Sequence, residues 1–133
     1  MSDTPYTVVN LKDVEDAAPS GGLAPNLEAR FARKPLGLEQ SGLTYFRMAP
    51  GFREPFGHRH GTQEEVYVVV SGSMRIKLDD DIVDLRAWDA IRIAPDTIRS
   101  REAGPNGAEM LLFGAPQAEG DGELLREWWT DEG

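Results

Sequence analysis

The sequence predicts a single all-β domain, and three observations lead to this fold class. From residue 43 onward, short apolar runs alternate with Gly, Pro and Asp residues, as expected of strands separated by turns. Ser71-Gly72-Ser73, Asp79-Asp80-Asp81 and Pro105-Asn106-Gly107 have the composition of hairpin loops. No strand-like run is followed by a long helical pattern, so a parallel sheet with crossover helices is not expected. The predicted strands are 43–48, 66–70, 74–78, 82–85, 90–94, 98–102 and 110–113.

Length and composition narrow the choice of function and location. The chain of 133 residues has the length of one domain and contains no cysteine. Disulfides and thiolate metal sites are therefore excluded, and a cytoplasmic location is expected. No apolar stretch has the length of a signal peptide or a membrane span. No membrane partner is expected. The formal net charge of -9, with scattered basic residues, argues against nucleic acid as a partner.

The predicted strands differ in how many of their faces are apolar. Residues 74–78 alternate between apolar and polar side chains, as in a strand with one face in the core and one in water. Residues 65–70 carry apolar side chains on both faces, so something must cover the second face. The facing sheet, the C-terminal tail or another subunit could do so, and we expect a homodimer. The residues on that second face are Val66, Val68 and Val70.

Two short helices are predicted outside the strand-rich region. Asn26 has the character of an N-cap, apolar residues follow at helical spacing, and Pro35 ends this helix. Residues 123–129 also show helical spacing and are interpreted as a short C-terminal helix whose tryptophans cap an apolar surface. The predicted organisation is an N-terminal arm with one short helix over 1–42, a barrel over 43–116 and a capping tail over 117–133.

The candidate chemistry gathers around the two histidines of the chain, His58 and His60. Because alternate residues of a strand share a face, both imidazoles can reach one metal ion. Glu64 and Glu65 follow at the start of the most apolar strand, where a carboxylate is costly to bury unless it is paired or bound to metal. Two histidines and one carboxylate are a minimal ligand set that leaves positions open for water or substrate. His58, His60 and Glu65 are therefore the candidate metal ligands, with Glu64 as the alternative carboxylate.

The same stretch resembles the first motif of the cupin family, which has a glycine, a His-x-His pair, a glutamate and a second glycine. Gly51 precedes the histidines, four residues separate His60 from Glu65, and six separate Glu65 from Gly72, as in the family pattern. The lead-in from Gly51 to His58 is one residue longer than the pattern. The resemblance, over roughly residues 49 to 113, implies a cupin-type jelly-roll β-barrel. To this barrel the sequence adds an N-terminal arm and a short C-terminal helix.

The second cupin motif is only partly present between residues 88 and 104. Pro95 is retained, but Trp88 stands in place of a glycine and Ser100 in place of the histidine that serves the family as a further metal ligand. Ser100 is therefore a candidate ligand-binding residue. Arg99 and Arg101 would point away from Ser100 and are expected to face solvent.

The resemblance implies a small-molecule site in the barrel mouth, and the family contains both binding modules and enzymes. The first interpretation is a binding module for a small polar or carboxylated ligand, with Tyr67 as a further ligand-binding residue. A divalent metal (Fe, Mn, Ni or Zn) would be held by His58, His60 and Glu65, although a metal-free hydrogen-bonded cluster of these residues is an open alternative. The second interpretation is a metal-dependent enzyme of dioxygenase, isomerase or lyase type.

Overall fold

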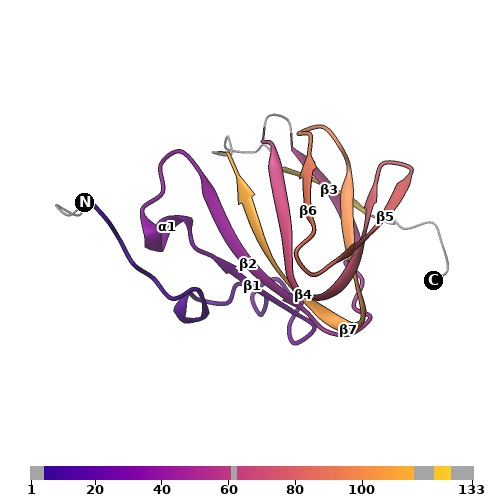
Figure 1. Cartoon of the computed structure of the whole chain (residues 1–133), viewed down its shortest axis with the longest axis horizontal. Helices are drawn as coiled ribbons and strands as arrows, with labels where there is room; N and C mark the ends of the chain where they lie inside the picture. Colours follow the sequence, from indigo (N-terminus) through magenta and orange to yellow (C-terminus); the bar gives the residue numbers. More distant parts are fainter. Residues whose placement is uncertain (1–4, 61–62, 116–121, 127–133) are drawn as a thin grey trace.

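Figure 1 shows the chain in a computed structural model, which describes residues 5–60, 63–115 and 122–126. The described residues form antiparallel β-structure with very little helix, which confirms the predicted all-β class. No helix in this described part has the length and apolar character needed to span a membrane. In chain order the elements are η1 (Leu11–Asp13), β1 (Leu27–Phe31), α1 (Arg33–Leu36), β2 (Gly42–Met48), β3 (Phe56–His60), β4 (Glu65–Leu78), β5 (Asp81–Arg86), β6 (Ala90–Ile93), β7 (Arg99–Gly114) and β8 (Gly122–Arg126).

Two long strands, β4 and β7, join the two walls of a barrel. The end of β7 lies between β2 and the start of β4, and β1 and β6 extend this first wall on its two sides. The beginning of β7 pairs with the end of β4, and the second wall continues through β3 to β8 on one side and to β5 on the other. Because each of the two long strands runs through both walls, the sheet curves round into the barrel seen in Figure 1.

Two of the predicted hairpin loops are instead irregularities inside these long strands. Ser71-Gly72-Ser73 lies within β4 where the register against β7 shifts, and Pro105-Asn106-Gly107 lies opposite it within β7. Gly72 has a φ of 73°, and a Cβ there would stand 2.1 Å from the carbonyl oxygen of Gly107. The glycine therefore serves a close approach of two backbones rather than a loop. The turn predicted at Asp79 is confirmed and joins β4 to β5.

The helix predicted between Asn26 and Pro35 is wrong over most of its length. Residues 27–31 form β1, in which Leu27 and Ala29 are buried and pair with β2. Alternate burial along such a short segment matches a strand, and pairing with β2 decides against the helix. Helix α1 begins only at Arg33, and Pro35 lies in its first turn, where the missing N–H costs no hydrogen bond.

The C-terminal helix predicted over residues 123–129 is also wrong for the part that the structure describes. Gly122–Arg126 is strand β8, which pairs antiparallel with β3. This pairing covers an edge of β3 that would otherwise expose its backbone groups. Trp128 and Trp129 lie outside the described residues.

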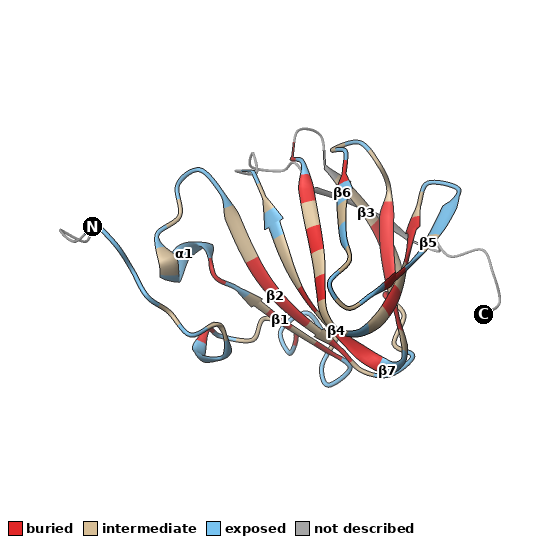
Figure 2. Cartoon of the chain, viewed as in Figure 1, coloured by how far each residue is buried: buried red, intermediate tan, exposed pale blue. Residues whose placement is uncertain are grey.

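The barrel core is built from alternate residues of the strands, and Figure 2 shows the resulting buried bands along β4. Tyr67 and Val69 share the buried face of β4 with Glu65, as predicted, while Val66 and Val68 on the other face are only partly buried. The other large apolar side chains that are fully buried are Met48, Ile76, Ile93 and Met110.

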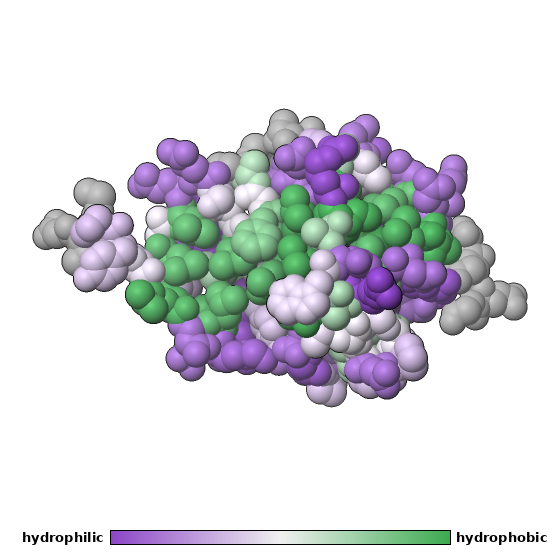
Figure 3. All heavy atoms as spheres, viewed as in Figure 1, coloured by the Kyte–Doolittle hydropathy of each residue, from purple (hydrophilic) through white to green (hydrophobic). Residues whose placement is uncertain are grey.

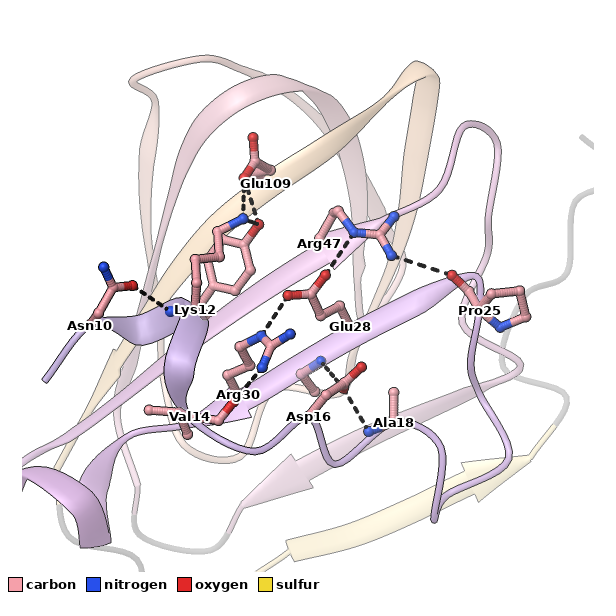
Figure 4. Close-up of polar contacts among 12 residues, drawn as sticks. Asn10, Lys12, Val14, Asp16, Ala18, Pro25, Glu28, Arg30, Arg47 and Glu109 are labelled. Carbon is pink, nitrogen blue, oxygen red and sulfur yellow. Dashed lines mark hydrogen bonds and ion pairs between the residues drawn. The ribbon is translucent and has the colours of Figure 1, made fainter.

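The segment before β1 packs on the outside of the barrel through polar contacts, several of which Figure 4 shows. Lys12 Nζ donates a hydrogen bond to the Tyr45 hydroxyl at 2.8 Å, and this hydroxyl donates to Glu109 Oε2 at 2.5 Å. Asp16 Oδ1 accepts the backbone N–H of Ala29 at 2.9 Å. These bonds tie the described part of the arm to β1, β2 and β7.

Candidate functional site

A cavity of about 570 Å³ lies at the end of the barrel where β2 and β4 begin and β7 ends. Glu65, Tyr67 and Arg101 line it and are buried, whereas Arg33 and Lys34 of α1 line it and are exposed. The cavity therefore has polar groups in its depth and two cations at its entrance. Its other lining residues are Phe31, Gly42, Leu43, Thr44, Phe46, His58, Gln63, Leu112 and Ala115.

Of the two adjacent glutamates, Glu65 is the one that faces this cavity. Glu65 is 4% exposed and opens β4 on its inward face. The side chain of Glu64 is 58% exposed, and its carboxylate lies 3.6 Å from the guanidinium of Arg92. The cavity thus receives one carboxylate from this pair.

The Glu65 carboxylate is held by Arg99, a partner that the sequence did not predict. Arg99 Nη1 donates to Glu65 Oε1 at 2.8 Å, and Arg99 Nη2 donates to the carbonyl oxygen of Ala94 at 2.7 Å. Arg99 has no exposed surface, so the expectation that it faces solvent is wrong. A buried guanidinium needs a carboxylate partner, and Glu65 supplies it.

Arg101, two residues further along β7, makes a second buried ion pair and was also wrongly expected in solvent. Its Nε and Nη2 donate to Glu54 Oε1 and Oε2 at 2.8 Å and 2.9 Å. The guanidinium lies 4.1 Å from the ring centre of Phe46 and 5.2 Å from that of Tyr67. This geometry combines a bidentate carboxylate pair with cation–π contacts on the cavity wall.

The pKa shifts follow from burial and from this ion pair. Burial alone would raise the pKa of Glu54, but the charge and hydrogen bonds of Arg101 outweigh it and hold the pKa below its usual value. Burial would likewise lower the pKa of Arg101, and Glu54 raises it instead. Burial raises the pKa of Tyr67, so its hydroxyl stays protonated at neutral pH. The depth of the cavity therefore presents the guanidinium of Arg101, whose charge is balanced by Glu54 behind it, and the neutral phenol of Tyr67.

The predicted metal ligands can be compared with this geometry only in part. His58 lines the cavity, and the side chain of His60 lies outside the described part of the structure. Among the described residues, no group of three or more His, Asp or Glu side chains is placed to hold a metal ion. Glu65 is already paired with Arg99, and the other buried carboxylate, Glu54, is paired with Arg101. The described residues therefore do not fit a divalent cation while these ion pairs stand. The ligand set of His58, His60 and Glu65 stays a prediction.

Ser100 lies on the other side of β7 from the two arginines. Its Oγ donates to the backbone carbonyl of Phe56 at 2.8 Å, the residue is fully buried, and it does not line the cavity.

The sequence did not predict Arg99, Arg101 and Glu54 as residues of the interior. The one sequence feature that could have indicated their position is the spacing of Arg99 and Arg101, because residues two apart share one face of a strand.

The barrel and the mouth cavity together define a cupin-type fold, and comparison with solved structures agrees. The chain is similar to a cupin protein from Bacteroides fragilis, with a TM-score of 0.68 and 22% identity over 98% of this chain and 96% of that chain. It is also similar to Pac13, a nucleoside dehydratase of Streptomyces, with a TM-score of 0.70 and 19% identity over 94% of this chain and 92% of that one. The predicted cupin-type jelly roll is confirmed.

A third similar structure is the polyketide cyclase RemF from Streptomyces resistomycificus. The TM-score is 0.70 and the identity 20%, over 95% of this chain and 88% of that chain. No protein-family model matches the chain, and no curated protein does. At such identities the likenesses establish the fold, and the function has to be argued from the site itself.

Proposed function

We propose that the cavity binds a small organic molecule that combines an apolar body with an anionic group. The composition of the cavity carries this proposal: Phe46 and Leu112 lie on an apolar wall, and Arg33 and Lys34 stand at the entrance. Two cations at one mouth are notable on a chain of net charge -9, which otherwise repels anions. The volume of about 570 Å³ lies in the range of pockets that enclose drug-sized ligands.

The deeper residues support the same ligand class. The charges of Glu65 and Glu54 are each matched by a buried arginine, so the interior does not repel an anion. The protonated hydroxyl of Tyr67 can donate a hydrogen bond that orients a polar group of the ligand. A ligand would therefore place its apolar body against the wall and its charged group toward the cations.

Isothermal titration with phenylacetate and phenylacetamide tests the proposal, because the two probes differ in charge and hardly in shape. We expect phenylacetate to bind about five-fold more tightly, the effect of roughly 1 kcal/mol from partly exposed charges. The double variant Arg33→Gln/Lys34→Gln should remove most of this difference. Equal affinity of wild-type protein for both probes would contradict the anionic part of the proposal.

A matched pair of variants tests whether the cavity is the site. Leu112 lines the cavity and Leu111, its neighbour on β7, does not. Leu112→Trp should fill the cavity and abolish phenylacetate binding, whereas Leu111→Trp should leave it unchanged. Undiminished binding by a folded Leu112→Trp variant would move the ligand elsewhere.

An enzyme is the second candidate, favoured by the presence of an imidazole, a carboxylate and a phenol in one cavity. His58, Glu65 and Tyr67 are side chains that serve as acids and bases in catalysis. Similar structures include a nucleoside dehydratase and a polyketide cyclase, whose names describe bond-forming and bond-breaking reactions on organic molecules. Proton NMR of the protein incubated with uridine would detect such turnover, which should disappear in His58→Gln.

We further propose that the outer face of β4 and β7 packs against a second copy of the chain. Val66, Val68 and Val70 are only partly buried on this face, Phe113 opposite Val66 is 43% exposed, and Trp88 nearby is 76% exposed. Figure 3 shows a hydrophobic band crossing this face over β2, β7 and β4. Light scattering should give twice the chain mass of 14.7 kDa, and Val68→Lys should return it to 14.7 kDa. A wild-type monomer at high concentration would contradict the dimer.

A further inference from the structure

Arg99 lies next to His58 and Glu65, the two predicted metal ligands whose side chains the structure describes. His58 and Arg99 are direct partners in the register of β3 and β7, so their side chains lie on the same face of that wall. From there Arg99 reaches the carboxylate of Glu65, at the start of β4 in the other wall, at 2.8 Å. One guanidinium thus spans the two walls at the place that the sequence assigned to a metal.

This guanidinium is fixed in position. Besides its bond to Glu65, it donates to the carbonyl of Ala94 at 2.7 Å, and the whole residue is inaccessible to solvent. Arg99 keeps its charge at any physiological pH, because a guanidinium is not deprotonated in proteins. A divalent cation approaching Glu65 would meet a buried cation that is already hydrogen-bonded to this carboxylate and does not lose its charge.

We propose that Arg99 takes the place of a metal ion at Glu65, so that the chain keeps a histidine and carboxylate pair but uses an internal cation in place of a bound one. The resemblance to cupins offers one reason for weak metal binding, because Ser100 stands in place of a histidine that serves the family as a metal ligand. The structure gives a different cause. Residue 99 faces Glu65, while Ser100 points to the carbonyl of Phe56.

The two explanations predict opposite outcomes for two neighbouring substitutions. If Arg99 suppresses metal binding, Arg99→His removes the competing charge and supplies an imidazole on the face that carries His58 and Glu65. Ser100→His would place its imidazole on the other side of β7 and leave metal affinity unchanged. If the lost ligand were at Ser100, the second variant would gain affinity and the first would not.

Titration with Co²⁺, followed by the visible absorption of the bound ion and by calorimetry, distinguishes them. We expect wild type and Ser100→His to bind Co²⁺ equally weakly, and Arg99→His to bind at least about 100-fold more tightly, the gain of one further protein ligand and one lost charge. Arg99→Gln should show about a ten-fold gain. Arg92→Gln, which removes the arginine beside the exposed Glu64, is the matched control and should behave as wild type.

The wild-type titration keeps the proposal testable even if the Arg99 variants do not fold. Tight one-to-one binding of Co²⁺ by wild type that is lost in Glu65→Gln would overturn it, as would a gain of affinity in Ser100→His alone. The proposal shares the cavity with the proposed organic ligand. This proposal is tested by Co²⁺ binding and the proposed function by phenylacetate binding. Failure of either proposal therefore leaves the other one open to its own test.

Discussion

Arg101 holds both carboxylate oxygens of Glu54, and it does so with its side chain and its backbone together. The guanidinium bonds measure 2.8 Å and 2.9 Å, and the backbone N–H of Arg101 donates to Glu54 Oε1 at 2.9 Å. The two side chains are 3% and 4% exposed. The pair joins the segment before β3 to β7 and fixes the cation that lies over Phe46 and Tyr67.

Replacing Glu54 by glutamine should destabilise the protein strongly. The variant leaves the charge of Arg101 buried without its partner, which costs about 3–5 kcal/mol of unfolding free energy. Urea denaturation followed by circular dichroism measures this loss. The control is Glu64→Gln, because Glu64 and Arg92 form an exposed pair worth about 0–1 kcal/mol. Similar small losses in both variants would show that the buried pair does not stabilise the fold.

Trp88 offers a test of backbone strain. It has a φ of 74°, although it is 76% exposed and not a glycine, and its N–H donates to the carbonyl of Val69 at 2.6 Å. A left-handed backbone costs a residue with a Cβ about 1–2 kcal/mol, which accounts for the glycine at this place in the cupin motif. Trp88→Gly should therefore be about 1 kcal/mol more stable than Trp88→Ala in thermal unfolding. Both variants lose the ring, so equal stability would argue against strain.

Gly72 should tolerate no side chain. An added Cβ would approach the carbonyl oxygen of Gly107 to 2.1 Å, and the φ of 73° adds strain. We expect Gly72→Ala to lower the unfolding free energy by more than about 2 kcal/mol, because backbone has to move on both long strands. Gly42→Ala is the control, since its Cβ would meet only ordinary contacts at 3.7 Å. Near-equal effects in chemical denaturation would contradict the proposed close approach.

The docking of the N-terminal arm should weaken in acid through Glu109. Hydrogen bonds from Tyr45 and Ser71 hold the pKa of Glu109 below its usual value. A depressed carboxyl pKa contributes stability that is present above the unfolded pKa, about 4.3, and is lost as the pH falls through the folded value. The stability difference between wild type and Tyr45→Phe should therefore shrink as the pH is lowered from 7 to 3. The control is Ser20→Ala, because the Ser20 hydroxyl donates to the backbone carbonyl of Ala17 at 3.0 Å, and its loss should show no such pH dependence.

The sequence by itself determined the features that depend on local periodicity. The pleat of a strand places alternate residues on opposite faces, so Glu65, Tyr67 and Val69 could be assigned to the interior and are found there. The first cupin motif and the spacing of the strands likewise predicted the barrel, since turns and apolar runs are properties of neighbouring residues. The prediction of a helix over residues 27–31 was wrong because a segment of five residues is too short to distinguish helical from strand periodicity.

Only the tertiary structure decided what the interior contains. Arg99 meets Glu65 across 34 positions of sequence and Arg101 meets Glu54 across 47, and both arginines looked like solvent-facing residues until these partners were in place. The free energy of a buried guanidinium depends on a carboxylate that chain folding brings to it, and no local pattern contains that partner. The same holds for β8, which is a strand because β3 offers it an edge.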